Sequence, residues 1–179
     1  MGADYLPPFD TLPKALKFRG QQALACDMGV ALAHAFLQAK DVGNGGKGSV
    51  DAPAEEPDCL IPVPVSARRL RERGYNQALL IARSLGKTLN VPVKARHLLK
   101  TLETGRQAEL SASQRQDNLA SAFVCVGDVE GLHVGLVDDV LTTGATLSVC
   151  EQTLLQAGAA SVSRWVAFRT PEKPEPIEP

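Results

Sequence analysis

The spacing of apolar residues along the chain alternates between a helical period and short continuous runs. Three segments show the helical period, with apolar residues recurring every three or four positions on one face. They predict helices over residues 21–40, 77–90 and 145–157. Another helix start is predicted at Thr11, because Thr is a good N-cap and Pro13 is tolerated in a first turn.

Short apolar runs lie between these helices and predict strands. Four of these runs cover residues 59–65, 93–99, 124–126 and 162–168. Another begins at His133 and ends at the two acids at positions 138 and 139. Strands that alternate with helices favour a single α/β domain with a central, mainly parallel sheet flanked by helices. We predict this domain over residues 1–169, with a flexible Gly- and Pro-rich loop at 43–57 and a disordered tail at 170–179.

Composition limits the class of protein. The chain has 179 residues and 44% hydrophobic content, enough for one domain with a buried core. A net charge of −1 gives no general attraction for nucleic acid or membrane surfaces, so any anion binding has to be local. No run is long enough to cross a membrane and no signal-peptide pattern opens the chain, which predicts a cytoplasmic protein without a membrane partner.

The four cysteines stand alone in the sequence and form no Cys-x-x-Cys pair. This spacing indicates neither a zinc module nor a disulfide framework. We therefore predict that they serve as small buried hydrophobic residues. They are Cys26, Cys59, Cys125 and Cys150.

Two adjacent acids, Asp138 and Asp139, follow the apolar run at 134–137 and precede a Thr- and Gly-rich turn at 142–146. Neighbouring carboxylates at the end of a buried strand repel each other and lose hydration, so they need hydroxyl donors or a cation beside them. A ribose diol with Mg²⁺ would serve. The turn supplies hydroxyls and backbone N–H groups at a helix N-terminus, which suits a phosphate. The alternative interpretation is a strand that ends in a polar, capped loop.

The ordered combination of apolar strand, two acids and Thr-Gly turn resembles the signature of the type I phosphoribosyltransferases. The resemblance implies that Asp138 and Asp139 are the catalytic acids that hold the ribose hydroxyls of phosphoribosyl pyrophosphate (PRPP), with Mg²⁺ as cofactor. It implies that the 5′-phosphate is cradled by Thr142, Thr143, Gly144, Ala145 and Thr146.

Residues 66–74 carry four arginines within six positions. Like charges on a helix repel one another unless they are solvated or matched by an anion. One interpretation is an exposed basic face. The other is a pyrophosphate site, because the segment directly follows the first main strand, at the edge of the sheet where ligands collect. The residues predicted for this site are Ser66, Arg68, Arg69 and Lys100.

Two further segments invite a functional interpretation. Residues 43–48 match the spacing G-x-G-x-x-G, but they follow a helix and open none, so we predict an ordinary loop. Residues 100–122 are basic and polar and precede Phe123. A mobile lid and an ordinary surface loop are both compatible with this composition.

The flanking sequence narrows the resemblance to the ComF family of phosphoribosyltransferase-like proteins. The similar residues are Pro62-Val63-Pro64, the Arg-rich stretch that ends in Arg73-Gly74-Tyr75-Asn76-Gln77, the spacing of residues 104–118, and Ala122-Phe123. The resemblance implies a role linked to natural competence and imported DNA. Two departures are expected to matter. The chain has no segment like the four-cysteine zinc module of many members, and Thr142 stands where 6-oxopurine phosphoribosyltransferases have an acid, which disfavours that reaction.

The main functional hypothesis is PRPP–Mg²⁺ binding with phosphoribosyl transfer to an unidentified acceptor base or nucleotide, in a DNA-uptake or nucleotide-salvage context. No side chain stands out as a base for the acceptor. The second hypothesis is therefore a PRPP-responsive binding protein of the DNA-uptake machinery with little turnover. The third is direct binding of single-stranded nucleic acid through the arginines, which the scarcity of aromatic residues disfavours. DNA-uptake proteins and a second copy of the chain, in a homodimer, remain open as partners.

Overall fold

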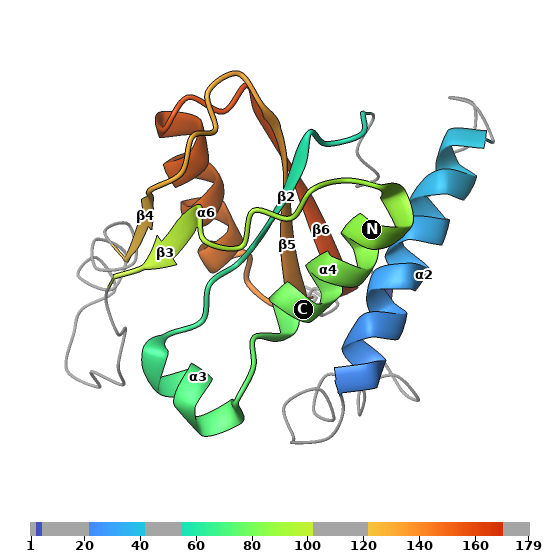
Figure 1. The fold of residues 1–179 in the computed structure, drawn as a ribbon, viewed down its shortest axis with the longest axis horizontal. Helices are drawn as coiled ribbons and strands as arrows, with labels where there is room; N and C mark the ends of the chain where they lie inside the picture. The colour runs from blue at the N-terminus through green and yellow to red at the C-terminus, as the bar shows by residue number, and fades with distance from the viewer. Residues whose placement is uncertain (1–2, 5–21, 42–54, 102–121, 170–179) are drawn as a thin grey trace, which may run out of the picture.

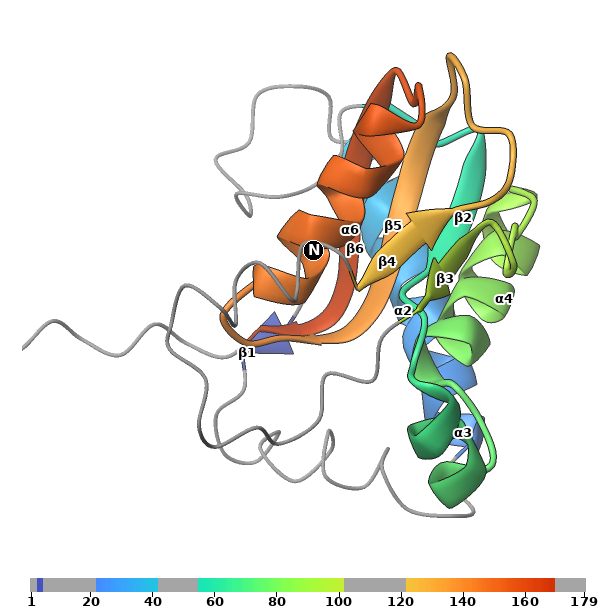
Figure 2. The same cartoon turned by 90° about the vertical axis from the view of Figure 1, so that its left-hand side faces the viewer.

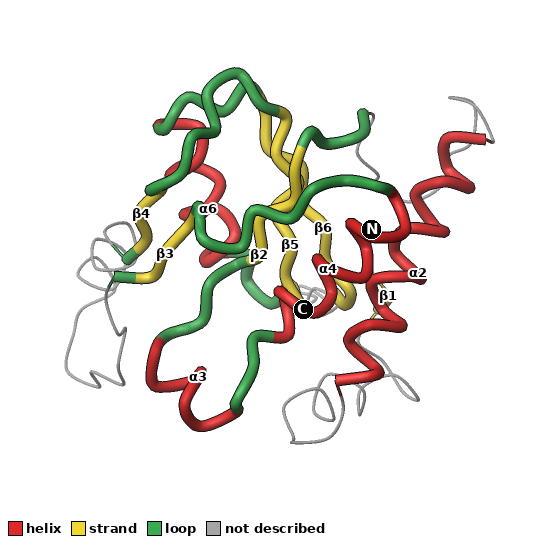
Figure 3. Tube along the Cα trace, viewed as in Figure 1, coloured by secondary structure: helices red, strands yellow, loops and turns green. Residues whose placement is uncertain are grey.

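A four-stranded parallel sheet forms the centre of the protein (Figure 1, Figure 3). The computed structural model describes residues 3–4, 22–41, 55–101 and 122–169. The strand order is β1-β6-β5-β2, and each neighbouring pair runs parallel. The strands are β1 (Ala3–Asp4), β2 (Cys59–Pro62), β5 (His133–Leu141) and β6 (Ser161–Arg169).

Helices cover both faces of this sheet. Helices α2 (Gln22–Asp41) and α4 (Gln77–Leu89) lie on one face, and α6 (Ala145–Gln156) lies on the other, as the side view in Figure 2 shows. Successive strand residues point to opposite faces, so Leu60 packs toward α2 and α4 while Ile61 packs toward α6. The α/β class with a central parallel sheet is thus confirmed.

The contact between α2 and α4 depends on a glycine. A Cβ at Gly29 would lie 2.4 Å from the carbonyl oxygen of Ile81, so only glycine lets the two helices approach this closely. Farther along α2, the ring of Phe36 lies 5.0 Å from that of Trp165 on the sheet. These contacts hold α4 on the sheet and thereby fix the position of its first turn.

Strand prediction fails between residues 93 and 97. Val93 forms only an isolated bridge to Leu60, and the chain then turns away from the sheet. Strand β3 (Leu98–Lys100) instead pairs antiparallel with β4 (Phe123–Cys125) in a separate two-stranded sheet. A turn in the middle of this apolar run separates it into two parts. Val93 contacts β2 at Leu60, whereas Leu98 pairs with β4.

The prediction that all four cysteines are buried is correct only in part. Cys59 and Cys150 are buried as expected, Cys125 is partly buried, and Cys26 is exposed, contrary to its prediction. The predicted helix start at Thr11, most of the 43–57 loop, the choice between lid and loop for 100–122, and the 170–179 tail lie outside the described residues. Within the described part of the chain, the helices are too short or too polar to cross a membrane.

Candidate functional site

One cavity lies where the carboxyl ends of β2 and β5 meet. Its volume is about 420 Å³, within the range of small-molecule sites. The connection that leaves β2 runs over the α4 face, whereas the connection that leaves β5 runs through α6 on the opposite face. The two strands are neighbours in the sheet, so this edge is a topological switch point, where open α/β sheets bind ligands.

The two predicted acids line this cavity. The sequence predicts a strand that ends at these acids. In the structure β5 continues to Leu141, because β6 offers hydrogen-bonding partners as far as Arg169. The backbone N–H of Asp139 donates to Oδ1 of Asp138 at 2.8 Å. Burial, and then the neighbouring Asp139 charge, raise the pKa of Asp138 well above its ordinary value of 3.8. Asp138 therefore favours its protonated form when no cation or hydroxyl donor is beside it.

Burial also keeps a thiol neutral beside these acids. Burial and the charge of Asp138 raise the pKa of Cys150, on α6, to about 12, although Lys100 opposes the shift. A thiol with this pKa is protonated at neutral pH and is a poor nucleophile. We therefore assign Cys150 to the apolar packing under the site and not to its chemistry.

The predicted phosphate turn follows β5 directly. Thr142 and Thr146 line the cavity, whereas Thr143, Gly144 and Ala145 are not among its lining residues. Gly144 is the N-cap of α6 with φ of +75°, a left-handed conformation that other residues adopt only with strain. Glycine has no side chain to cap α6, and the N–H of Ala145, the first residue of the helix, donates to Oγ1 of Thr143 at 3.4 Å. The turn thus presents the hydroxyls of Thr142 and Thr146 to the cavity beside a helix N-terminus.

The cationic side of the cavity comes from two other segments. Ser66 caps the short helix α3 (Ala67–Arg73) by accepting from the backbone N–H of Arg69, and both residues line the cavity. Lys100, at the end of β3, lines it as well. Burial and then the charge of Arg69 lower the pKa of Lys100. An anion beside them would relieve the mutual repulsion of these two cations.

Arg68 is placed differently from its prediction as a pyrophosphate ligand. Its Nε lies 2.8 Å from Oε1 of Glu72, one helical turn along α3, and the pair is exposed. Arg68 is not among the residues that line the cavity. The structure therefore divides the arginine cluster between a cavity-facing part and a solvent-facing part. The interpretation as an exposed basic face describes Arg68, and the interpretation as a pyrophosphate site stays a prediction for Arg69.

Sequence reasoning missed three polar residues of the site. Arg73, Asn76 and Gln77 also line the cavity, the first from the end of α3 and the others from the start of α4. One signal was available for Arg73, because it lies four positions after Arg69 and residues spaced by four share a helix face. Asn76 and Gln77 could be found only once the contact of α4 with the sheet was known.

The cavity lining combines three kinds of polar group. Thr142 and Thr146 supply hydroxyls, Asp138 and Asp139 supply carboxylates, and Arg69, Arg73 and Lys100 supply positive charge. Carboxylates can accept from a vicinal diol, and guanidinium and ammonium groups can bind phosphate oxygens.

The chain is similar in sequence to proteins named for DNA utilization and competence. It is 36% identical over 168 residues to the DNA utilization protein YhgH of Salmonella typhimurium, covering 94% of this chain and 70% of that protein. It is 37% identical over 112 residues to competence protein F of Haemophilus influenzae, covering 61% and 49% of the two chains. No protein-family model matches the chain.

Solved structures support the fold independently. Glutamine PRPP amidotransferase from B. subtilis superposes with a TM-score of 0.54 and 22% sequence identity, over 81% of this chain and 26% of that chain. The similarity covers only a part of that larger protein and concerns the fold alone.

Proposed function

Because the chain belongs to the ComF family of phosphoribosyltransferase-like proteins, we propose that it binds PRPP with Mg²⁺ and transfers the phosphoribosyl group to an acceptor. The observation that carries the proposal is the single cavity that joins the acid pair, the Thr-rich turn and the cations. A phosphoribosyl pyrophosphate has a 5′-phosphate, a diol and a diphosphate in that order. The cavity offers a complementary group for each of them.

The donor set also suits Mg²⁺. Asp138 and Asp139 provide the carboxylate oxygens that this hard cation prefers, and its charge would offset the burial and the carboxylate repulsion that raise the pKa of Asp138. Among the described residues no group of three or more acids, histidines or cysteines forms a protein cage for a metal. We therefore expect the ion to be held mainly by ligand oxygens and water, which is common for Mg²⁺ at phosphate sites.

In the proposed reaction the bond between C1 of the ribose and the pyrophosphate oxygen breaks, and pyrophosphate leaves with the electron pair. The acceptor forms a bond to C1 and loses its proton. Asp138 and Asp139 would hold the diol, while Arg69, Arg73 and Lys100 would stabilise the charge that develops on the leaving group. The protein contributes mainly orientation and charge, since no described side chain is placed as an evident base.

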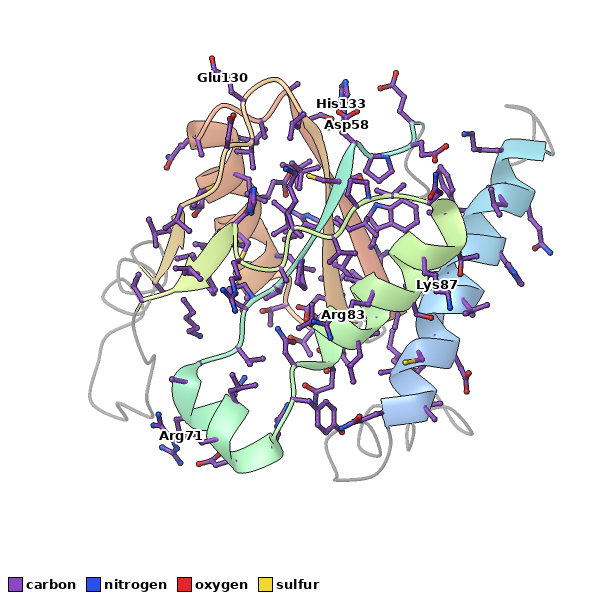
Figure 4. The ribbon with its side chains drawn as sticks, in the orientation of Figure 1. Asp58, Arg71, Arg83, Lys87, Glu130 and His133 are labelled. Atoms are coloured by element: carbon purple, nitrogen blue, oxygen red, sulfur yellow. The ribbon has the colours of Figure 1, made fainter. Side chains whose placement is uncertain are left out.

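The test is the double variant Asp138→Asn/Asp139→Asn, titrated with PRPP and Mg²⁺ in a calorimeter. We expect binding to be lost while the protein stays folded, because the amides relieve carboxylate repulsion but bind a diol and a cation poorly. The matched control is Asp128→Asn/Glu130→Gln, two exposed acids in the loop before β5, where Figure 4 labels Glu130. Affinity like that of the wild type in the Asp138/Asp139 variant would refute the proposal.

A second candidate function is PRPP-responsive binding with little turnover. Two observations favour it: the described part of the site has no evident base, and relatives are named for competence and DNA utilization. Sensing needs only the phosphate and diol contacts, whereas catalysis also needs an organised acceptor. Release of pyrophosphate from PRPP in the presence of a panel of nucleobases would decide for the transferase. Tight PRPP binding without release would decide for the sensor.

A basic surface favours direct nucleic-acid binding as a third candidate. Residues 59–101 contain nine Lys and Arg but one acid, whereas the remainder of the chain contains ten basic and nineteen acidic residues. Arg71, Arg83 and Lys87 of this segment are exposed on α3 and α4 (Figure 4). Retention of single-stranded DNA that weakens steeply with salt would support this function. Few aromatic residues are present for base stacking, 4% of the chain, which argues against it.

A further inference from the structure

Asn76 has an unusual place between the arginine helix and the sheet. It is the N-cap of α4, but its side chain does not cap the helix. Instead, its Nδ2 donates to the carbonyl oxygen of Val63 at 3.0 Å. Val63 precedes α3 and Asn76 follows it, so this bond joins the two chain segments from which α3 projects (Figure 1).

The same bond fixes the orientation of the amide. A carbonyl oxygen can only accept, so the atom that faces Val63 has to be the nitrogen. The other end, Oδ1, is buried and has no hydrogen-bond partner among the described residues. A buried acceptor without a donor is unfavourable. Asn76 lines the cavity, so a side chain that moves there, or a group that enters it, can supply the missing donor.

Arg73 is our candidate for that donor. It ends α3, three residues before Asn76, and it lines the same cavity. No hydrogen bond of its guanidinium is found within the described part of the chain. Arg69 is the other arginine of the cavity, but it is more exposed than Arg73 and its charge acts on Lys100.

Helix α3 needs such an anchor. None of its residues is buried, so no apolar packing fixes the direction in which its arginines point. A guanidinium has five N–H donors in a rigid plane and can bind a phosphate oxygen and an amide oxygen together. An anion in the cavity would draw Arg73 inward, toward Asn76.

We infer that Asn76 is a positioning residue, whose Oδ1 accepts a hydrogen bond from Arg73 and holds this guanidinium on the diphosphate of the bound ligand. We make this inference on the basis of the proposed function, since the diphosphate belongs to the same ligand. Asn76 itself does not contact the reacting atoms. It links α3, through Val63, to the carboxyl end of β2.

The test is a double-mutant cycle on affinity, with inorganic pyrophosphate, PRPP and ribose 5-phosphate as separate probes, each with Mg²⁺. The variants are Asn76→Leu, Arg73→Met and the two combined. Asn76→Leu also removes the hydrogen bond to Val63. This loss occurs whether or not Arg73 is present, so it cancels when the two effects of Asn76→Leu are compared. We expect Asn76→Leu to weaken pyrophosphate and PRPP roughly tenfold and to have little further effect once Arg73 is replaced. Ribose 5-phosphate, which lacks the diphosphate, should bind as before.

Matched cycles with Arg69→Met and Arg71→Met test the choice of arginine. Arg71 is exposed on the same helix and is absent from the cavity lining, so its effect should add to that of Asn76→Leu. Coupling of Asn76 with Arg69 or Arg71 instead of Arg73 would overturn the inference, as would additive losses for Asn76 and Arg73. If Asn76→Leu does not fold, Asn76→Ser replaces it, because its shorter hydroxyl cannot bridge Val63 and Arg73.

The outcomes separate the inference from the proposed function. A wild-type protein that binds pyrophosphate but not PRPP would refute the proposed function alone, and the cycle with pyrophosphate would still decide the role of Asn76. A wild-type protein that does not bind pyrophosphate would overturn the inference.

Discussion

The backbone N–H of Asp139 donates to the side-chain carboxyl of Asp138 at 2.8 Å, so the two acids are tied together within strand β5. The hydrogen bond stabilises the ionised form of Asp138, but burial and the second carboxylate outweigh it. The ionised acid pair is therefore electrostatically unfavourable by itself, and strongly shifted pKa values of this kind cluster at functional sites.

A consequence for stability follows from the raised pKa of Asp138. As pH rises above 3.8, the ordinary value of the group, the unfolded chain loses this proton while the folded chain keeps it. The folded state then binds more protons, so the free energy of unfolding falls until the pH passes the folded pKa. Asp138→Asn should remove this fall. The measurement is urea unfolding of the metal-free protein at a series of pH values from about 4 upward, with exposed Asp128→Asn as control.

The phosphate turn can be tested with a matched pair of glycines. Gly144 and Gly131 both have positive φ, +75° and +70°, and both leave room for a methyl group. Alanine at either position should cost about 1–2 kcal/mol of stability from left-handed strain alone. Only Gly144→Ala, at the start of α6, should also weaken binding of ribose 5-phosphate, measured by calorimetry. Equal affinities in the two variants would show that the turn does not hold the phosphate.

The division of the arginine cluster predicts different effects for neighbouring residues. Arg69→Ala should weaken PRPP roughly tenfold or more, because charge-assisted contacts to phosphate are strong, and should affect ribose 5-phosphate much less. Arg68→Ala should leave both affinities nearly unchanged, since Arg68 pairs with Glu72 outside the cavity lining. Equal losses for Arg68→Ala and Arg69→Ala would indicate a general charge effect of the helix.

The contact of α2 with α4 predicts a stability effect of unexpected sign. In a free helix, Gly→Ala is favourable by about 1 kcal/mol. At Gly29 the added Cβ would meet the carbonyl oxygen of Ile81 at 2.4 Å, so we expect Gly29→Ala to be destabilising by about 1–3 kcal/mol. Thermal unfolding gives the measurement. An increased melting temperature would mean that α2 moves aside without loss.

The sequence alone determined the class of fold and the centre of the site. The helices over 77–90 and 145–157 were found within one residue, because each buries one face and the apolar period of such a helix is a local property. The pairing of two acids with a Thr-Gly turn over residues 138–146 is also local, so the sequence located it directly.

Only the tertiary structure decided which side chains share the cavity. Arg68 and Arg69 are neighbours in sequence, but one helical step of about 100° sends them to different surroundings. Asn76 enters the site because the packing of α4 on the sheet brings its first turn beside Val63. Leu98 and Leu99 leave the main sheet because β4, distant in sequence, offers them partners. These outcomes depend on contacts between distant segments, and the local pattern of residues does not contain them.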